Sequence, residues 1–292
     1  MGKLITGGNG FIGSHISGDL RPSSRNLNLL NFQQTLEYFK ANDFTSVVHC
    51  AANISSAVKM KENHHRFLIE NLSMDINVLE AARISGVQNL IALGSISGLK
   101  SNSDGFIDES CFDLAPSSTV NYGYNVEKYF QPYLMRAYQM DFELNYKSIL
   151  LSNCYGPGSV IAEDAPLVSS LVFRILKARE LDVDLALYGT GEDLRNLTYV
   201  GDLDNIVIQH LGNTENIDPL IIASPYVLKI RDMTEIIARI LNFDKRIIFE
   251  DYSTNSTVNN KICKNDKLME IGYQIDWTPP ELGLELTLRE FI

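Results

Sequence analysis

The sequence predicts an α/β fold, in which a doubly wound parallel sheet carries a smaller C-terminal lobe. The first observation is a glycine-rich turn, Thr6-Gly-Gly-Asn-Gly10, between a short apolar strand and a helical pattern. The second is the alternation of apolar strands with helical patterns that follows as far as Leu151. Parallel strands need long crossover connections, so strands that alternate with helices indicate a parallel sheet.

The glycine-rich turn is expected to bind the phosphates of a dinucleotide. Its glycines permit a tight turn, let a pyrophosphate approach the backbone and allow a following helix to pack closely on the strand. We expect this helix to continue to about Leu20 and its N-terminus to donate N–H groups to the anion. The residues assigned to this contact are Gly7, Gly10, Phe11, Ile12 and Gly13.

The stretch after this helix favours NADP over NAD as the cofactor. A dinucleotide fold usually carries an acid about 20 residues after the glycines, where it binds the ribose of NAD. No Asp or Glu lies between Asp19 and Glu37, and Arg21 and Arg25 flank two serines there. Arginine suits a 2′-phosphate because its guanidinium matches phosphate oxygens. A solvated basic loop is the alternative, and NAD is the second cofactor considered.

The next elements follow the pattern of such a sheet. Asn31 can cap a helix that runs to about Ala41. Further elements are expected as a strand at 46–52, a helix at 64–85, a strand at 89–94, a helix at 121–140 and a strand at 146–151. One apolar face of the first long helix is marked by Leu68, Leu72, Ile76 and Leu79, and the second has helical spacing at Val126, Phe130, Leu134 and Ala137.

The regular alternation weakens beyond Tyr155-Gly-Pro-Gly158. Helical and strand patterns still recur there, without a linker that would separate independently folding halves. They predict a helix at 167–179, a strand at 185–188, a helix at 202–211, a strand at 219–223 and a helix at 233–241.

Composition excludes several functional classes. A net charge of −11 argues against nucleic acid or an anionic membrane surface as a partner. No apolar run approaches the roughly 20 residues of a membrane span. The glycine turn begins six residues from Met1, which leaves no room for a signal peptide, so a cytoplasmic protein is expected. Four scattered cysteines and five histidines show no metal-ligand spacing, so no metal site is expected.

Tyr124 and Lys128 lie four residues apart, on one face of the second long helix. A phenol has a reference pKa of about 10, and a neighbouring ammonium favours its ionised form. Ser95 ends a neighbouring strand, where its hydroxyl can orient a carbonyl group. These three residues are the expected catalytic set, which moves a proton while a nicotinamide moves a hydride.

At this point the chain resembles the extended short-chain dehydrogenase/reductase family of nucleotide-sugar epimerases, dehydratases and reductases. The resemblance covers essentially the whole chain, and within the family the group of GDP-fucose synthases is the most similar. The matching stretches are Thr6–Gly13, His49-Cys-Ala-Ala52, Asn71, Ser95, Tyr124-x-x-x-Lys128, Asn153-Cys-Tyr-Gly-Pro157, Tyr188-Gly-Thr-Gly191 and Arg195-Asn-Leu-Thr-Tyr-Val-Gly-Asp202.

The resemblance implies a Rossmann NADP-binding domain and a nucleotide-sugar-binding lobe. The first comprises residues 1–155 plus 194–224, and the second comprises 156–193 plus 225–292. Further implied cofactor contacts are Leu29, Ala51, Ala52, Asn71 and Lys128. The implied substrate contacts are Ser97, Asn153, Arg174, Tyr188 and Arg195, of which Arg195 is expected at the diphosphate or nucleoside. For Arg174 an exposed helix cation is an equal alternative.

The chain departs from the GDP-fucose synthase pattern at two positions. Ser97 stands where that group carries a catalytic cysteine, and Pro166 falls near the place of its histidine. Epimerisation beside a ketone needs such an acid/base pair, and a serine hydroxyl is too weak a base. Cys154 could substitute, but a packed cysteine beside the sheet is favoured. Reduction without epimerisation is therefore expected.

The leading hypothesis is an NADP-linked reductase of a 4-keto nucleotide sugar, with a GDP-sugar favoured. A 4-epimerase or 4-dehydrogenase that retains NAD is the alternative, and a non-catalytic nucleotide sensor is a third. The resemblance also implies a homodimer through the helices at 64–85 and 121–140.

Overall fold

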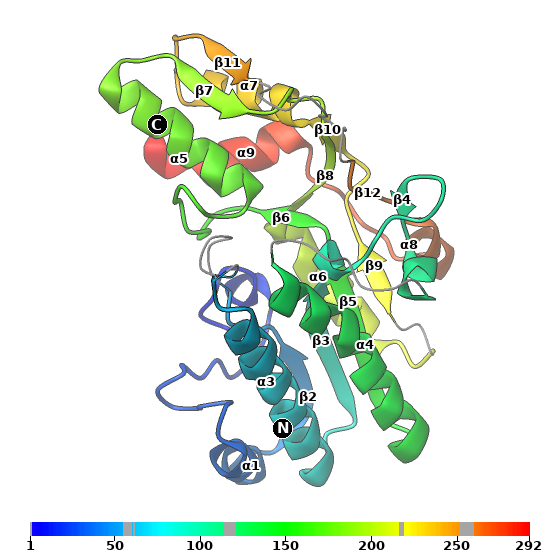
Figure 1. The fold of residues 1–292 in the computed structure, drawn as a ribbon. Helices are drawn as coiled ribbons and strands as arrows, with labels where there is room; N and C mark the ends of the chain where they lie inside the picture. The colour runs from blue at the N-terminus through cyan, green and yellow to red at the C-terminus, as the bar shows by residue number, and fades with distance from the viewer. Residues whose placement is uncertain (1, 55–59, 61, 114–120, 216–218, 251–259) are drawn as a thin grey trace.

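The computed structural model describes residues 2–54, 60, 62–113, 121–215, 219–250 and 260–292. They form a larger unit built on a sheet, with a smaller lobe above it in Figure 1. The sheet has the order β1-β2-β3-β5-β9, and every pairing in it is parallel, which confirms the α/β fold class. Its strands are β1 (Gly2–Thr6), β2 (Phe44–His49), β3 (Asn89–Ser95), β5 (Asn145–Leu151) and β9 (Leu220–Ile222).

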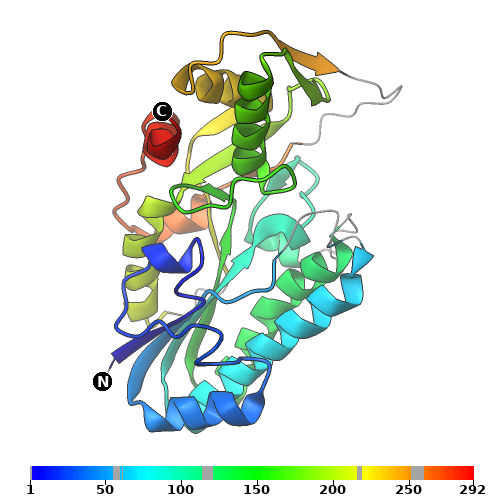
Figure 2. The same ribbon diagram turned by 90° about the vertical axis from the view of Figure 1, so that its left-hand side faces the viewer.

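Helices cover both faces of this sheet (Figure 2). One face is covered by α1 (Phe32–Ala41), α3 (His64–Ile84) and α4 (Tyr122–Phe142), and the other by α6 (Leu203–Gly212). The predicted cap of α1 is confirmed, since Asn31 Oδ1 accepts a hydrogen bond of 3.0 Å from Gln34 N. The long helices and strands therefore lie where their sequence periodicity places them.

The prediction of a helix after the glycine turn is wrong. Only a 3-10 turn, η1 (Gly13–His15), forms there. The chain then returns to β1, and Leu20 makes a single parallel bridge with Leu4. Gly18 lies so close to the strand that a Cβ on it would be 2.4 Å from Ile5 Cγ1. An α-helix continuing through this segment is incompatible with that contact.

The apolar spacing of α3 and α4 does not coincide with their buried faces. Ile76 and Phe130 belong to that spacing, and they are 46% and 45% exposed. The buried faces also include polar residues: Asn71 and Asp75 on α3, and Glu127, Lys128 and Gln131 on α4. Each helix thus buries polar side chains beside apolar ones and leaves other apolar side chains exposed, which sequence hydropathy alone does not predict.

The upper lobe combines short strands with three helices, α5, α7 and α9, against a second apolar core. A three-stranded sheet has the order β10-β8-β6, and β11 pairs with β7 in parallel. The elements of the lobe are β6 (Asn153–Tyr155), α5 (Leu167–Leu181), β7 (Leu185–Tyr188), β8 (Leu194–Tyr199), β10 (Val227–Lys229), α7 (Ile230–Ile240), β11 (Ile247–Glu250) and α9 (Pro280–Leu288).

The chain crosses back to the larger unit near its end. Leu268 of α8 (Asp266–Ile271) packs in the core beneath the sheet, and β12 (Ile262–Cys263) pairs with β4 (Phe106–Ile107). Short 3-10 turns complete the structure at η2 (Ile96–Gly98), η3 (Glu109–Asp113), η4 (Val200–Asp202) and η5 (Arg289–Phe291).

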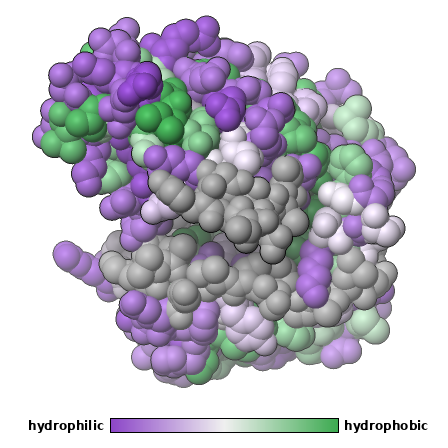
Figure 3. Space-filling model, turned by 45° about the horizontal axis from the view of Figure 1, so that its top comes forward, coloured by the Kyte–Doolittle hydropathy of each residue, from purple (hydrophilic) through white to green (hydrophobic). Residues whose placement is uncertain are grey.

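On the face shown in Figure 3, hydrophobic residues lie in small groups among hydrophilic ones. Within the described ranges, no helix has both the length and the apolar character of a membrane span.

Candidate active site

A cavity of about 710 Å³ opens at the carboxyl ends of β1 and β2. Its walls are the glycine turn, the loop at 22–30, the segment after β2 and the first turns of α3. Its lining residues are Thr6, Gly7, Asn9, Gly10, Pro22, Ser23, Ser24, Leu27, Asn28, Leu29, Leu30, Cys50, Ala51, Ala52, Asn53, Arg66, Glu70 and Met74. Ligands of α/β sheets bind in this kind of position, beyond the carboxyl ends of the strands.

The glycine turn has the backbone geometry of a phosphate cradle. Gly7 adopts a φ of +64°, and a Cβ there would lie 2.6 Å from Ala51 N. A Cβ on Gly13 would lie 2.3 Å from the carbonyl oxygen of Gly7. Only glycine fits at these two positions, so the turn leaves its backbone open towards the cavity. The cavity and the turn together fit the phosphates and adenosine of a dinucleotide.

Arg21 is already engaged with the backbone of the glycine turn. Its guanidinium donates a 2.5 Å hydrogen bond to the Gly13 carbonyl and another to the Ile16 carbonyl. It thereby adds side-chain hydrogen bonds to carbonyls at the end of the short 3-10 turn, where no α-helix follows. Arg25 is exposed on the same loop. The roles of these two arginines at a 2′-phosphate stay predictions, whereas Ser23 and Ser24 do line the cavity.

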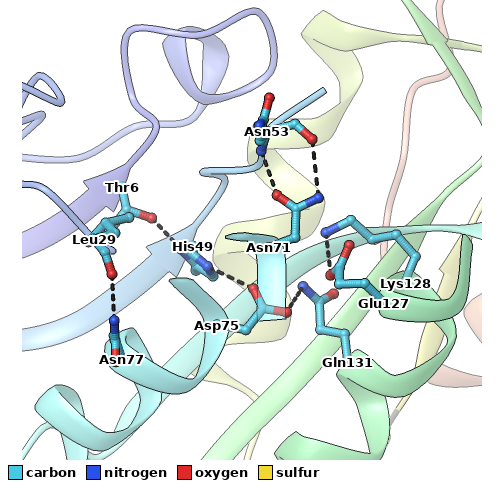
Figure 4. A network of polar contacts seen from close by, with 10 residues as sticks. All are labelled: Thr6, Leu29, His49, Asn53, Asn71, Asp75, Asn77, Glu127, Lys128 and Gln131. Carbon is cyan, nitrogen blue, oxygen red and sulfur yellow. Dashed lines mark hydrogen bonds and ion pairs between the residues drawn. The ribbon is translucent and has the colours of Figure 1, made fainter. Parts of the chain in front are cut away.

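Asn71 shapes the cavity wall after β2 (Figure 4). Its Oδ1 accepts a 2.6 Å hydrogen bond from Asn53 N, and its Nδ2 donates to Asn53 O at 3.1 Å. The buried Asn71 side chain therefore fixes the backbone beside Ala51 and Ala52. Leu29 is held in the same way on the opposite wall, where its carbonyl accepts from Asn77 Nδ2 at 2.8 Å.

The predicted catalytic residues come together at the end of β3. Ser95 ends that strand, and its hydroxyl is hydrogen-bonded to the Tyr124 phenol. The Lys128 ammonium lies 5.8 Å from the centre of the Tyr124 ring. Gly98 allows this approach of α4, since a Cβ there would lie 2.4 Å from Asn125 O.

The electrostatic environment of the Tyr124 phenol has opposing parts. Burial raises its pKa, the Lys128 ammonium lowers it, and the neighbouring Glu127 raises it again. The hydrogen bond with Ser95 lowers the pKa of Tyr124 further. Ser97 follows closely, and its backbone N–H donates to Ser95 Oγ at 3.2 Å. Ser97 Oγ is buried without a hydrogen-bond partner in the described part of the chain.

Three residues in this region were missed by sequence reasoning. Glu127 Oε1 lies 3.0 Å from Lys128 Nζ, and both side chains are buried. Asp75 Oδ1 lies 3.0 Å from His49 Nε2, and His49 Nδ1 lies 2.5 Å from Thr6 Oγ1 (Figure 4). The available signal was an acid directly before the catalytic lysine, on the buried side of a helix.

Ser97 lies in η2 beside Ser95, and the other four predicted substrate residues are divided between two parts of the upper lobe. Asn153 on β6 and Arg195 on β8 lie on neighbouring regions of its central sheet. The Arg195 side chain is 13% exposed and lies 3.4 Å from Asp193 Oδ2. Burial lowers its pKa, and the Asp193 carboxylate opposes this effect.

Arg174 and Tyr188 lie farther out. The Arg174 guanidinium lies 3.6 Å from Glu163 Oε1. Tyr188 is 84% exposed at the end of β7, which pairs with β11 at the outer edge of the lobe (Figure 1). Their roles in substrate binding stay predictions.

Cys154 beside the sheet is half-buried, and burial raises its pKa. The thiol therefore stays protonated at neutral pH and cannot accept a proton there.

Comparison with known proteins gives a consistent set of relatives. Residues 3–222 match the model of the NAD dependent epimerase/dehydratase family. A GDP-L-fucose synthase of Dictyostelium discoideum is 25% identical over 303 residues, covering 99% of this chain and 94% of that protein. A GDP-L-colitose synthase of Yersinia pseudotuberculosis is 25% identical, covering 100% and 98%. An NADP-bound GDP-L-fucose synthetase of Naegleria fowleri has a similar fold, with a TM-score of 0.89 at 21% identity over 99% of this chain and 92% of its own.

Proposed function

The chain belongs to the NAD dependent epimerase/dehydratase family, and on this premise we propose that it is an NADP-linked oxidoreductase that reduces the 4-keto group of a GDP-sugar. The observation that carries this proposal is the contact of Ser95 with Tyr124 beside Lys128. A hydroxyl, a phenol and an ammonium in this arrangement can orient a carbonyl group and protonate its oxygen.

Each of the three side chains has a separate role in the protonation of a ketone. The Ser95 hydroxyl donates a hydrogen bond that orients the carbonyl, and the Tyr124 phenol donates the proton to its oxygen. Lys128 stabilises the phenolate that remains, because its positive charge lowers the pKa of Tyr124. A bound nicotinamide supplies the hydride for this reaction.

The cavity supports a phosphorylated dinucleotide as the cofactor. Gly7 and Gly10 line the cavity, where the absence of side chains lets a pyrophosphate approach the backbone, and the loop at 22–30 offers hydroxyl and amide groups for a ribose phosphate. No acidic residue lies in that loop to repel a 2′-phosphate.

The substrate is inferred from the relatives. The two similar synthases carry a GDP-sugar in their names, which favours a GDP-sugar as the substrate here.

Reduction without epimerisation is supported by the groups near the catalytic set. Ser97 is a hydroxyl where the related synthases are expected to carry a thiol, and hydroxyls are weak bases. The Cys154 thiol is kept protonated by burial. Neither group suits the removal of a proton from carbon beside a ketone.

The assay is oxidation of NADPH by the purified full chain with a GDP-4-keto-6-deoxy sugar, followed by absorbance and by NMR of the product. We expect stoichiometric oxidation of NADPH and a hydroxyl at C4. Tyr124→Phe should lower kcat by at least about 100-fold, whereas Tyr122→Phe, the same change on an exposed turn of α4, should leave it unchanged.

Other outcomes would point away from this proposal. Failure to oxidise NADPH with any 4-keto nucleotide sugar would sink it. Interconversion of C4 epimers by protein purified with bound NAD would favour the epimerase. Binding of a GDP-sugar with no turnover, and with no effect of Tyr124→Phe, would favour a sensor.

A further inference from the structure

Two buried carboxyl groups, Asp75 and Glu127, lie in the polar network that also contains Lys128 (Figure 4). Asp75 comes from α3 and Glu127 from α4, and they are 1% and 0% exposed. Glu127 Oε1 contacts Lys128 Nζ at 3.0 Å. Asp75 has two hydrogen-bond partners, with His49 Nε2 at 3.0 Å and Gln131 Nε2 at 3.2 Å. Burying several ionisable groups so close together costs folding free energy unless their charges cancel.

Both ring nitrogens of His49 face polar partners. Its Nδ1 lies 2.5 Å from the Thr6 hydroxyl, which can donate or accept a hydrogen bond. Its Nε2 lies 3.0 Å from Asp75 Oδ1 and can donate a hydrogen bond to that carboxylate. Asp75 therefore receives hydrogen bonds from His49 and Gln131, and both favour its ionised form.

The two carboxyl groups differ in their ionisation. Burial raises the pKa of Glu127 to about 8, with the Asp75 charge adding to the shift and Lys128 opposing it. Burial also disfavours the charge on Asp75, but the hydrogen bond from His49 and the charge of Lys128 bring its pKa below the ordinary value. For Lys128, burial is outweighed by Glu127 and Asp75, and its pKa is raised. At neutral pH the cluster thus holds one carboxylate, one carboxylic acid and one ammonium.

Among the described residues, β3, η2 and β5 place no further charged group against this cluster. Residues 89–98 of β3 and η2 contain no ionisable side chain. On β5, the Tyr146 hydroxyl donates to Val87 O at 3.0 Å, and the Lys147 ammonium donates to Asn213 O. The groups that face Glu127 are therefore Asp75 and Lys128, with Tyr124 one helical turn away.

We propose that Asp75 and Glu127 share a single negative charge that neutralises Lys128, and that Glu127 is a positioning residue which holds the Lys128 ammonium at the Tyr124 phenol. This inference rests on the proposed function for the roles of Tyr124 and Lys128. It adds that the reaction is supported by a second pair of residues, which do not touch the substrate.

The shared charge has a consequence for Tyr124. While Glu127 is protonated, the cluster is neutral and Lys128 lowers the pKa of the phenol. When Glu127 ionises, the added negative charge raises the pKa of Tyr124. The phenol then stays protonated at higher pH, so it remains able to donate a proton to a ketone.

The shared proton can be observed directly by infrared titration of the full chain, without substrate. We expect a carboxylic acid band that disappears with a midpoint near pH 8. Glu127→Gln should remove this band, and Asp75→Asn should move its midpoint down by about one unit or more. Glu80→Gln, which removes a half-buried carboxyl from the outer side of α3, should leave it unchanged. Absence of the band in the wild type, or its persistence in Glu127→Gln, would overturn the proposal.

The positioning role is tested by the pH profile of NADPH-dependent reduction. Each single variant keeps one carboxyl beside Lys128, so kcat at neutral pH should fall far less than in the double variant. The double variant Asp75→Asn/Glu127→Gln should lose at least about tenfold more than the two single effects combined, with little change in KM. Multiplicative single effects would contradict a shared charge.

A double variant that fails to fold leaves a decisive comparison. In Glu127→Gln the alkaline limb of kcat should begin about one pH unit below that of the wild type, because no charge develops beside Tyr124. Identical limbs would reject the positioning role. Should no nucleotide sugar be reduced, the infrared titration still decides whether the charge is shared, so failure of the proposed function is distinguishable from failure of this inference.

Discussion

The Ser17 hydroxyl donates a hydrogen bond of 2.5 Å to Asp204 Oδ2, and Ser17 N donates to the other oxygen of the same carboxylate at 2.7 Å. Asp204 lies in the first turn of α6. These two bonds connect the segment after the glycine turn to α6, which comes 187 positions later in the chain. They take the place of the helix that would otherwise cover this part of the sheet.

Asp204→Ala should therefore loosen the N-terminal segment. Two hydrogen bonds to a charged acceptor are lost, but the site is exposed, so we expect the free energy of unfolding to fall by about 1 kcal/mol. Urea denaturation measures this change, and fluorescence titration should show weaker NADPH binding. Asp232→Ala, which removes an acid from the first turn of α7, serves as the control. Equal stability of the two variants would argue against the tether.

Gly13→Ala tests the cradle of the glycine turn. The added Cβ would lie 2.3 Å from the Gly7 carbonyl oxygen, so backbone atoms must move apart. We expect NADPH affinity to fall by at least about tenfold, or 1.4 kcal/mol, in equilibrium fluorescence titrations. Gly212→Ala is a matched control, because a Cβ at the end of α6 meets nothing within 4 Å. Retention of wild-type affinity in Gly13→Ala would show that this turn does not bind the cofactor.

Local chemistry made much of the fold and of the site predictable. Glycine spacing predicted the turn, alternation predicted the parallel sheet, and the four-residue spacing of Tyr124 and Lys128 placed both on one helix face. Ser95 followed from its position at a strand end. The structure confirms the fold class, and it brings these three residues together.

The remaining features depend on contacts between distant residues. The first helix is absent because of contacts such as that of Ser17 with Asp204, 187 positions later in the chain. The buried side of α4 is hidden from a hydropathy argument because Glu127 and Lys128, which contact each other inside, reduce the hydropathy of that side. A periodicity argument counts polar residues as outward, so it does not predict that Glu127 is buried.

Ser95→Ala should reduce turnover without removing the cofactor site. The hydroxyl is hydrogen-bonded to the Tyr124 phenol, and this bond lowers the pKa of Tyr124. We expect kcat for reduction to fall by about 100-fold, while the Kd for NADPH stays within about threefold of the wild type. Steady-state kinetics and fluorescence titration check the two parts. A matching loss of NADPH affinity would indicate that Ser95 acts in binding rather than in orientation of the carbonyl.

The apolar side chains left outside on α3 and α4 predict a homodimer. These helices lie side by side on the outer face of the larger unit (Figure 2). Their exposed residues include Ile69, Ile76, Phe130 and Tyr133. An apolar surface on two long adjacent helices is stabilised by a second copy that covers it.

Phe130→Glu should convert this dimer to a monomer, because the charge would be buried at the interface. Size-exclusion chromatography with light scattering measures the mass of the species. Leu181→Glu places the same charge on an exposed apolar position of α5 and should not change the mass. A wild-type protein that is monomeric at micromolar concentration would contradict the prediction.

The raised pKa of Glu127 predicts a specific dependence of stability on pH. Its pKa is about 8 in the folded chain and 4.5 in the ordinary carboxyl, so the folded state binds this proton more tightly. The resulting stabilisation is complete below about pH 4.5 and is lost as the pH rises through about 8. Relative to Glu127→Gln, the wild type should therefore lose a few kcal/mol of unfolding free energy across this range, at about 1.4 kcal/mol for each unit of pKa difference.

Urea denaturation of both proteins at a series of pH values measures that difference. Glu80→Gln provides a control in which the pKa shift has the opposite sign. In the wild type, the hydrogen bond of Glu80 with Arg83 lowers the pKa of Glu80. The contribution of Glu80 is lost as the pH falls below its ordinary range, and is constant between pH 6 and 9, roughly. A constant difference between wild type and Glu127→Gln over the same range would mean that Glu127 is already ionised at neutral pH. Asp75 and Glu127 would then carry two negative charges beside Lys128, rather than one between them.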